Sequence, residues 1–185
     1  MTIDYAILGI LSCRSVTGYD LKKIIQQLPF LYWSGNNNQI YKSLVELLDR
    51  GLVTNEVQHQ ESLPSKKIYT ITEPGLTELR KWVLRSPELP EHKNQFLIQL
   101  AWADRLTEEE LEQLISGYED EIKLQLITLQ EIKRRKPFSP DRTLREEKLW
   151  ELIYDNMIAS CESELSWVNK VREEIVNHKG GENDL

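Results

Sequence analysis

Residues 36–75 have the sequence NNNQIYKSLVELLDRGLVTNEVQHQESLPSKKIYTITEPG, and this stretch decides the fold. Over about residues 37–50 the apolar side chains recur at helical spacing, and Gly51 is the residue type that ends helices in a left-handed conformation. Residues 52–57 and 67–72 have the composition and alternation of short strands, and the polar stretch between them suits a hairpin tip. The sequence therefore predicts a helix followed directly by a β-hairpin.

The residues on either side of this stretch add three more helices. Residues 3–13 are apolar nearly all round, which is typical of a buried helix. Thr17 is a candidate N-cap for a helix over about 18–28, and Thr72 for a helix after the hairpin. The order helix, helix, helix, strand, strand, helix is that of a winged helix-turn-helix, in which the third helix and the hairpin contact DNA.

Beyond a proline-rich connector at 86–90, the pattern is almost wholly helical. Helices are predicted over about 92–104, over 107–136 with a capping box at its start, and over 141–178. Apolar side chains also lie off the main stripes of the two long helices, at Leu124, Ile127, Ile153, Ile158 and Trp167. A second apolar face on such helices indicates burial against another copy of the chain.

The predicted fold class is mostly α with a small two-stranded β wing. An N-terminal winged helix-turn-helix would occupy residues 1–86, and a C-terminal domain of long antiparallel helices would form the dimer interface over 87–179. Residues 180–185 are expected to form a disordered tail.

The charge is divided unevenly along the chain. Residues 1–86 carry ten Lys and Arg against eight Asp and Glu, whereas residues 87–185 carry thirteen against twenty-two, and the whole chain has a net charge of −7. Residues 1–86, here called the head, are mildly basic, and residues 87–185 are acidic. This charge distribution permits contact between the head and phosphates but does not require it.

Other classes of protein and site fit the sequence poorly. His59, His92 and His178 are isolated, and the glycines form no phosphate-binding loop, so we expect no metal, no cofactor and no enzymatic activity. No apolar run is long enough to span a membrane and the N-terminus does not resemble a signal peptide, so a cytoplasmic protein is expected. Cys13 and Cys161 are expected to be free, buried thiols. The basic run at 133–136 ends a predicted helix, where cations complement the helix dipole, and we favour that role over nucleic-acid binding.

Several segments occur in the order and spacing of a known family: AILGIL at 6–11, TGYDL at 17–21, QIYKSL at 39–44, GLV at 51–53 and KIYTITEPG at 67–75. Together they resemble the PadR-type winged-helix transcriptional regulators. Residues 93–175 resemble, by pattern more than by motif, the C-terminal helical domain of the longer members. The resemblance implies a homodimer, formed here through about 93–178, on a palindromic double-stranded DNA operator. It also implies repression in most cases and, in some, release by a small molecule.

The predicted third helix is the candidate recognition helix. Its N-terminal polar residues are the candidate DNA contacts: Asn37, Asn38, Gln39, Tyr41, Lys42 and Ser43. Asn and Gln pair bidentately with adenine, Lys reaches guanine or phosphate, and the resemblance assigns a DNA contact to Tyr41. The alternative is that the Asn run only caps a helix and that Tyr41 packs locally.

Lys66 and Lys67 are expected where the tip of the wing meets its second strand, a position that reaches phosphates or the minor groove in winged helices. Two lysines are also common at an ordinary solvated strand end. Gly18 and Tyr19 match the family motif, and we expect them to serve the fold through a tight turn and a core ring.

Two further hypotheses concern partners. Tyr5, Trp150, Tyr154 and Trp167 are candidates for a pocket that takes a small aromatic effector, although aromatic residues at helical spacing more often form core. The alternative function is a helical adaptor whose winged helix and long helices bind protein instead of DNA. The low basicity of the head keeps this alternative open.

Overall fold

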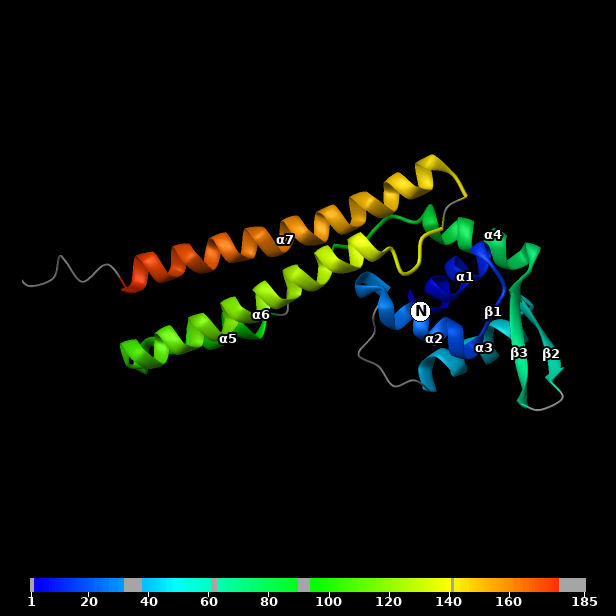
Figure 1. Cartoon of the computed structure of the whole chain (residues 1–185), viewed down its shortest axis with the longest axis horizontal. Helices are drawn as coiled ribbons and strands as arrows, with labels where there is room; N and C mark the ends of the chain where they lie inside the picture. Colours follow the sequence, from blue (N-terminus) through cyan, green and yellow to red (C-terminus); the bar gives the residue numbers. More distant parts are fainter. Residues whose placement is uncertain (1, 32–37, 61–62, 90–93, 141, 177–185) are drawn as a thin grey trace, which may run out of the picture. The chain divides into compact units, whose positions relative to one another are not determined.

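The computed structural model describes residues 2–31, 38–60, 63–89, 94–140 and 142–176 (Figure 1). Its elements follow in the order α1 (Thr2–Cys13), β1 (Val16–Thr17), α2 (Gly18–Gln27), the 3-10 turn η1 (Pro29–Leu31), α3 (Asn38–Asp49), β2 (Val53–Gln60), β3 (Leu63–Ile71), α4 (Glu73–Val83), α5 (Gln95–Ala101), the 3-10 turn η2 (Ala103–Arg105), α6 (Glu108–Arg135) and α7 (Leu144–Val176). The predicted order of helices and strands is confirmed, with a third, short strand in addition.

The chain divides into two compact units. The first comprises Met1–Glu88 together with Pro137–Leu144, and the second comprises Leu89–Lys136 and Arg145–Leu185. The first unit thus includes a segment that the sequence pattern grouped with the helical part. In this segment the Phe138 side chain is buried, and the guanidinium of Arg14 lies 5.4 Å from the centroid of its ring.

Local capping residues begin and end the helices of the winged helix. The Thr17 hydroxyl accepts a hydrogen bond from the backbone N–H of Asp20 at 3.1 Å, and the Thr72 hydroxyl accepts one from the N–H of Gly75 at 3.1 Å. Gly51 follows α3 with φ of 67°, in the left-handed region. All three predictions are confirmed, because each depends only on neighbouring residues.

The wing belongs to a three-stranded antiparallel sheet of order β1-β3-β2, not to a two-stranded one. β1 pairs with β3 through Val16 opposite Tyr69, and so joins the start of α2 to the wing. Strands β2 and β3 are also longer than predicted, because the backbone ladder continues through polar residues, with an irregularity at Gln58 to Gln60. A polar ribbon is stable there because the backbone hydrogen bonds of paired strands do not depend on apolar side chains.

The core of the first unit is formed by apolar side chains of α1, α2, α3 and the sheet. Its fully buried members are Ile3, Ile7, Leu8, Leu21, Leu28, Leu44, Leu47 and Val53. Burial of each such side chain contributes about 1.5–3 kcal/mol of transfer free energy. This core holds α3 by one face and leaves its other face exposed.

The second unit is built on α6 and α7, which run antiparallel (Figure 1). The buried side chains of its core are Phe96, Ile115, Ile122, Leu129, Cys161 and Val168. Ion pairs link the helices at both ends: Arg172 Nε lies 2.9 Å from Glu112, and Lys136 Nζ lies 2.9 Å from Glu147. The predicted capping box at the start of α6 is present, formed by Thr107 and Glu110.

The basic run at the end of α6 is used within the second unit. Lys133 is paired with Asp155, and Lys136 with Glu147, both on α7. Arg134 and Arg135 both contact Glu131, whose pKa these guanidinium hydrogen bonds lower to about 2. These pairings favour the structural role of the run.

Both cysteines are free, and Cys161 is buried as expected, whereas Cys13 is only half-buried. Across the residues that the structure describes, no helix combines the length and the apolar character needed to cross a bilayer.

Candidate nucleic-acid interface

Helix α3 has one buried face and one exposed face. Ile40, Leu44 and Leu47 pack into the core, whereas Asn38, Tyr41 and Lys42 are exposed near the N-terminal end. Gln39 is half-buried beside them. Asn37 lies outside the described residues. The first turns of α3 therefore present amide, phenol and ammonium groups to solvent from one helix.

Ser43 does not belong to this exposed set. Its side chain is only 3% exposed, on the same face as Ile40 and Leu47. The prediction that Ser43 contacts DNA is wrong for this structure, because residues three and four apart share a helix face and Ser43 follows Ile40 by three.

Tyr41 combines the two roles that the sequence left as alternatives. Its side chain is 45% exposed, yet its ring packs over Gly18 so closely that a Cβ atom there would lie 2.9 Å from Tyr41 Cε1. Burial raises the pKa of the Tyr69 phenol, and the proximity of Tyr41 adds to this. One edge of the Tyr41 ring is therefore held by the fold, and the rest is available to a partner.

Tyr19 is placed differently from the expectation. The neighbouring Gly18 is buried, as a residue serving the fold should be, but Tyr19 is 68% exposed and contributes no ring to the core. It stands in the first turn of α2, next in sequence to the glycine on which Tyr41 packs. Tyr19 is thus an additional candidate contact residue, which the motif match alone had assigned to packing.

Lys42 is available for an external anion. Its ammonium lies 3.9 Å from Glu46 one turn along α3, and 74% of its side chain is exposed. A pair this exposed contributes well under about 1 kcal/mol, so exchanging Glu46 for a phosphate costs little.

The wing lysines lie inside β3, not at the junction of tip and strand. Lys67 is opposite Val57 and Lys66 is opposite Gln58, and both side chains are exposed. Successive side chains of a strand point to opposite faces, so Lys66 and Lys67 are directed to different sides of the wing. Only one of the two is therefore directed to any one face of the wing.

A closely packed junction connects the end of α3, the wing and α4. The Thr72 hydroxyl donates to the carbonyl oxygen of Gly51 at 2.8 Å, and the N–H of Thr72 donates to that of Leu52 at 3.1 Å. A Cβ atom at Gly75 would lie 2.1 Å from the Leu52 carbonyl oxygen. This junction holds the end of α3 close to the end of β3.

The four aromatic residues considered for an effector pocket fall in both units, and each is described within its own. Tyr5 stacks on Trp82 with ring centroids 4.7 Å apart, and its hydroxyl donates to Glu78 at 3.1 Å. Burial and the Glu78 hydrogen bond raise the pKa of Tyr5.

On α7, Trp150 is half-buried and Tyr154, one turn further on, is buried. Burial raises the pKa of Tyr154. Trp167 lies about 20 Å beyond Tyr154 at the rise of an α-helix, and it packs edge-on against Phe96. Within one chain, Trp167 is therefore too far along α7 to share a pocket with the other two.

Two family models match the chain. The model of the transcriptional regulator PadR-like family matches residues 7–81, and that of the virulence activator alpha C-terminal domain matches residues 92–175. Among curated proteins, the negative transcriptional regulator PadR of Bacillus subtilis (strain 168) is 33% identical over 113 residues. That match covers 60% of this chain and 62% of the relative, so the chain spans less than two thirds of the length of this relative.

Solved structures of the same Bacillus subtilis protein match nearly the whole chain. The structure in complex with operator DNA has a TM-score of 0.79 at 26% identity and covers 92% of this chain and 97% of that one. The structure in complex with p-coumaric acid has a TM-score of 0.75 at 24% identity and covers 94% of each chain, which is a likeness of fold. The chain carries both domains in order, with the family's segments along its winged helix, and it belongs to the PadR-like family of transcriptional regulators.

Proposed function

We propose that this chain is a sequence-specific DNA-binding repressor that acts as a homodimer on a palindromic operator. The observation that carries the proposal is the exposed N-terminal face of α3, where Asn38, Tyr41 and Lys42 stand on a helix whose opposite face is locked in the core. The relative solved in complex with operator DNA shares this fold. The proposed activity is binding without a catalytic step, and it takes place on DNA in the cytoplasm.

The side chains on the exposed N-terminal face of α3 are suited to bind the edges of bases in a major groove. The Asn38 amide is able to donate and accept toward adenine, and the Lys42 ammonium to donate to guanine O6 and N7. The phenol groups of Tyr41 and Tyr19 are suited to phosphate oxygens, which position a protein without specifying sequence. The wing supplies Lys66 or Lys67 to the adjacent backbone.

The dimer is part of the proposal because the head is only weakly basic. Apolar side chains that one chain leaves exposed on α5, α6 and α7 are the proposed interface: Leu97, Ile98, Leu124, Ile127, Leu149, Leu152 and Ile153. A second copy that covers these side chains would double the number of placed DNA contacts. Two-fold symmetry of the protein then calls for two-fold symmetry of the operator.

The test is the salt dependence of DNA binding. We expect the full-length protein to bind DNA from its own upstream region at low salt, measured by fluorescence anisotropy. Each phosphate contact contributes about −0.9 to the slope of log affinity against log salt. Lys66 and Lys67 face opposite sides of the wing, so we expect one of them to contact a phosphate. The double variant Lys66→Ala with Lys67→Ala should therefore reduce the magnitude of the slope by about 0.9 per protomer. Arg80→Ala with Lys81→Ala, which removes two exposed cations of α4 and so makes the same change of charge, is the matched control and should leave the slope unchanged.

A protein adaptor is the competing function, and the same titration decides between them. A protein that prefers no DNA over competitor at roughly 50–100 mM salt, where specific binding is strong, is not a DNA-binding repressor. Equal slopes for the lysine double variant and the wild type would remove the wing from the interface while leaving α3 in it.

We also propose that a small aromatic effector binds near Trp150 and Tyr154 on α7. The relative solved with p-coumaric acid supports an effector of this kind, although the residues named here come from this chain alone. Quenching of tryptophan fluorescence by aromatic acids should be lost in Trp150→Leu. A ligand that quenches but leaves operator affinity unchanged would have no regulatory role.

A further inference from the structure

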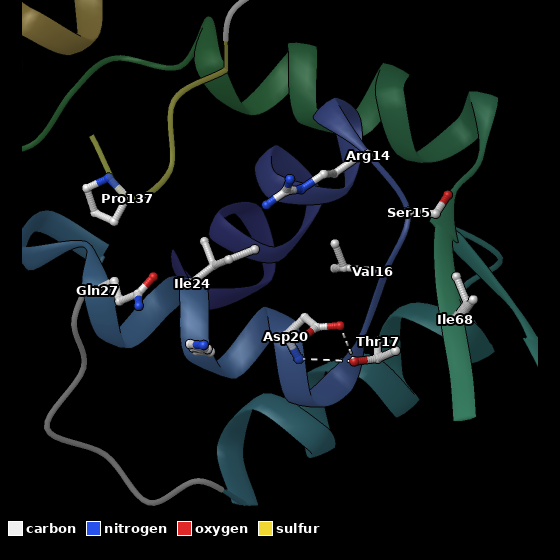
Figure 2. Close-up of a pocket in the computed structure, with 10 residues that line it drawn as sticks. Arg14, Ser15, Val16, Thr17, Asp20, Ile24, Gln27, Ile68 and Pro137 are labelled. Atoms are coloured by element: carbon white, nitrogen blue, oxygen red, sulfur yellow. Dashed lines mark hydrogen bonds between the residues drawn. The ribbon is translucent and has the colours of Figure 1, made fainter. Parts of the chain in front are cut away.

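The first unit contains a hollow of about 700 Å³ that the proposed DNA interface does not use. Figure 2 shows it between the connection from α1 to α2, one side of α2, and Pro137 of the returning segment. Its wall includes Arg14, Lys23, Ile24, Gln27, Ile68 and Pro137. A volume of this size is in the range of small-molecule sites, which are about 300–1,000 Å³.

Two cations, Arg14 and Lys23, border the hollow together with one carboxylate, Asp20. The Arg14 guanidinium lies over the Phe138 ring, 5.4 Å from its centroid, and within the described residues neither Arg14 nor Lys23 forms an ion pair. The acidic residue of the wall, Asp20, is engaged with the Thr17 hydroxyl, which donates to it at 2.7 Å. The wall thus has an excess of positive charge, which favours an anion.

The rest of the wall is aliphatic. Val16 and Ile24 are buried side chains whose remaining surface faces the hollow, and Ile68 and Pro137 extend this apolar floor. An inorganic anion would leave the floor uncovered, whereas a ligand with an aliphatic body would bury it and gain about 25 cal/mol for each Å² removed from water. The occupant that fits both halves of the wall is an amphipathic anion.

The hollow lies on the side of α2 away from α3. Gly18, which contacts Tyr41, shares its helix face with Leu21 and Ile25, whereas Lys23 and Gln27 lie roughly half a turn around at 3.6 residues per turn. The two cations of the hollow are therefore not placed to continue the DNA-binding surface of α3. Lys23 shares its face of α2 with Tyr19, one turn before it, so ligand binding to the hollow has to be measured without DNA.

We propose that this hollow is a binding site for a small carboxylate with a short aliphatic body. The carboxylate pairs with Arg14 and Lys23, and the aliphatic chain lies on Ile24, Ile68 and Pro137. This site is separate from the aromatic effector site on α7 and from the DNA-binding residues of α3.

The test is isothermal titration calorimetry on the full-length protein without DNA, with hexanoate as the probe and 1-hexanol as its neutral counterpart. Trp150→Leu should leave hexanoate binding unchanged, which separates the hollow from the proposed aromatic site on α7. We expect hexanoate to bind in the millimolar range or tighter and 1-hexanol to bind more weakly. Lys23→Ala should weaken hexanoate about fivefold, as the loss of one exposed charge contact does.

Two further variants make the test specific. Lys22→Ala changes the same charge at the neighbouring position outside the wall and should leave hexanoate affinity unchanged. Asp20→Asn keeps an acceptor for Thr17 but removes the negative charge from the wall, so it should strengthen hexanoate binding. Thermal melts confirm that each variant folds.

The proposal is overturned if hexanoate gives no heat of binding, or if it binds no better than 1-hexanol. It is also overturned if Lys22→Ala weakens hexanoate as much as Lys23→Ala does. If Lys23→Ala weakens DNA binding and leaves hexanoate binding unchanged, Lys23 is a phosphate contact and the hollow is not its site. Because binding is measured without DNA, a failure of the repressor function does not affect this result.

Discussion

Gly18 and Gly75 both occupy positions where a side chain would collide with a neighbour, but the neighbours differ. A Cβ at Gly75 would meet the backbone carbonyl oxygen of Leu52 at 2.1 Å, whereas one at Gly18 would meet the end of the Tyr41 ring at 2.9 Å. A backbone atom in a tight junction cannot move far, but a ring at the end of a side chain turns more easily. The two glycines should therefore respond differently to substitution.

Gly75→Ala should lower the free energy of unfolding by about 3 kcal/mol, as severe overpacking does, measured by urea denaturation. Gly117→Ala on α6 is the matched control. Nothing lies within 4 Å of a Cβ there, so the better helix propensity of Ala should raise stability by up to about 1 kcal/mol. Equal stability of Gly75→Ala and the wild type would show that the junction at Leu52 adapts.

Gly18→Ala should change function more than stability. The added methyl displaces the Tyr41 ring, so we expect a loss of stability of about 1 kcal/mol or less and a loss of operator affinity of about tenfold. Anisotropy titrations and thermal melts on the same samples measure the two effects. Unchanged affinity in a folded variant would mean that the position of Tyr41 does not matter for DNA binding.

The burial of Ser43 could have been predicted from the sequence, but it was missed. The apolar residues Ile40, Leu44 and Leu47 already define the buried face, and Ser43 falls on it by spacing, so period alone was sufficient to exclude it. The same holds for Tyr19. The buried side chains Leu21, Ile24 and Ile25 define the core face of α2, and Tyr19 lies nearly opposite that face by spacing.

At the scale of elements, predictions that depended on adjacent residues were confirmed. Thr17, Thr72 and Gly51 act within a few residues of the helices that they cap. The features that were missed depend on distant partners. The short strand at Val16 exists because Tyr69 is opposite it, and Phe138 is buried at a place where Arg14, 124 positions earlier in the chain, lies over its ring.

The pairing of α6 with α7 leads to a pH prediction. Hydrogen bonds from Lys123 and then from Arg172 lower the pKa of Glu119 below its ordinary value of 4.5. Stability from a lowered carboxyl pKa is fully present above the unfolded pKa and is lost as the pH falls through the folded pKa. The wild type should therefore lose melting temperature below about pH 4.5 more steeply than Arg172→Met, in which part of this shift is absent.

Lys170→Met is the control for this comparison. Lys170 is paired with Glu174 at 3.6 Å, but both side chains are largely exposed, so its removal should leave the acid limb of the curve as in the wild type. Identical pH profiles for Arg172→Met and the wild type would mean that Arg172 does not contribute to the acid sensitivity.

At the scale of the whole molecule, the proposed dimer is open to a direct test. Leu124 and Ile127 on α6 are 61% and 63% exposed in one chain. Leu124→Glu with Ile127→Glu places two charges in the proposed interface, so it should give monomers in sedimentation velocity and reduce operator affinity by at least about a hundredfold. Gln125→Glu, at an exposed position between them, should remain dimeric. A dimer that survives the double substitution would place the interface on other helices.

The return of Pro137–Leu144 to the first unit has a consequence for biosynthesis. The Arg142 guanidinium donates to the Ser12 carbonyl oxygen at 2.9 Å, a contact across 130 positions of the chain. During translation the winged helix leaves the ribosome long before this segment does, and such distant contacts form late. A nascent chain of about ninety residues should accordingly be more sensitive to proteases than the same residues in the finished protein. The last step in building the first unit then takes place only after all of α6 has been synthesised.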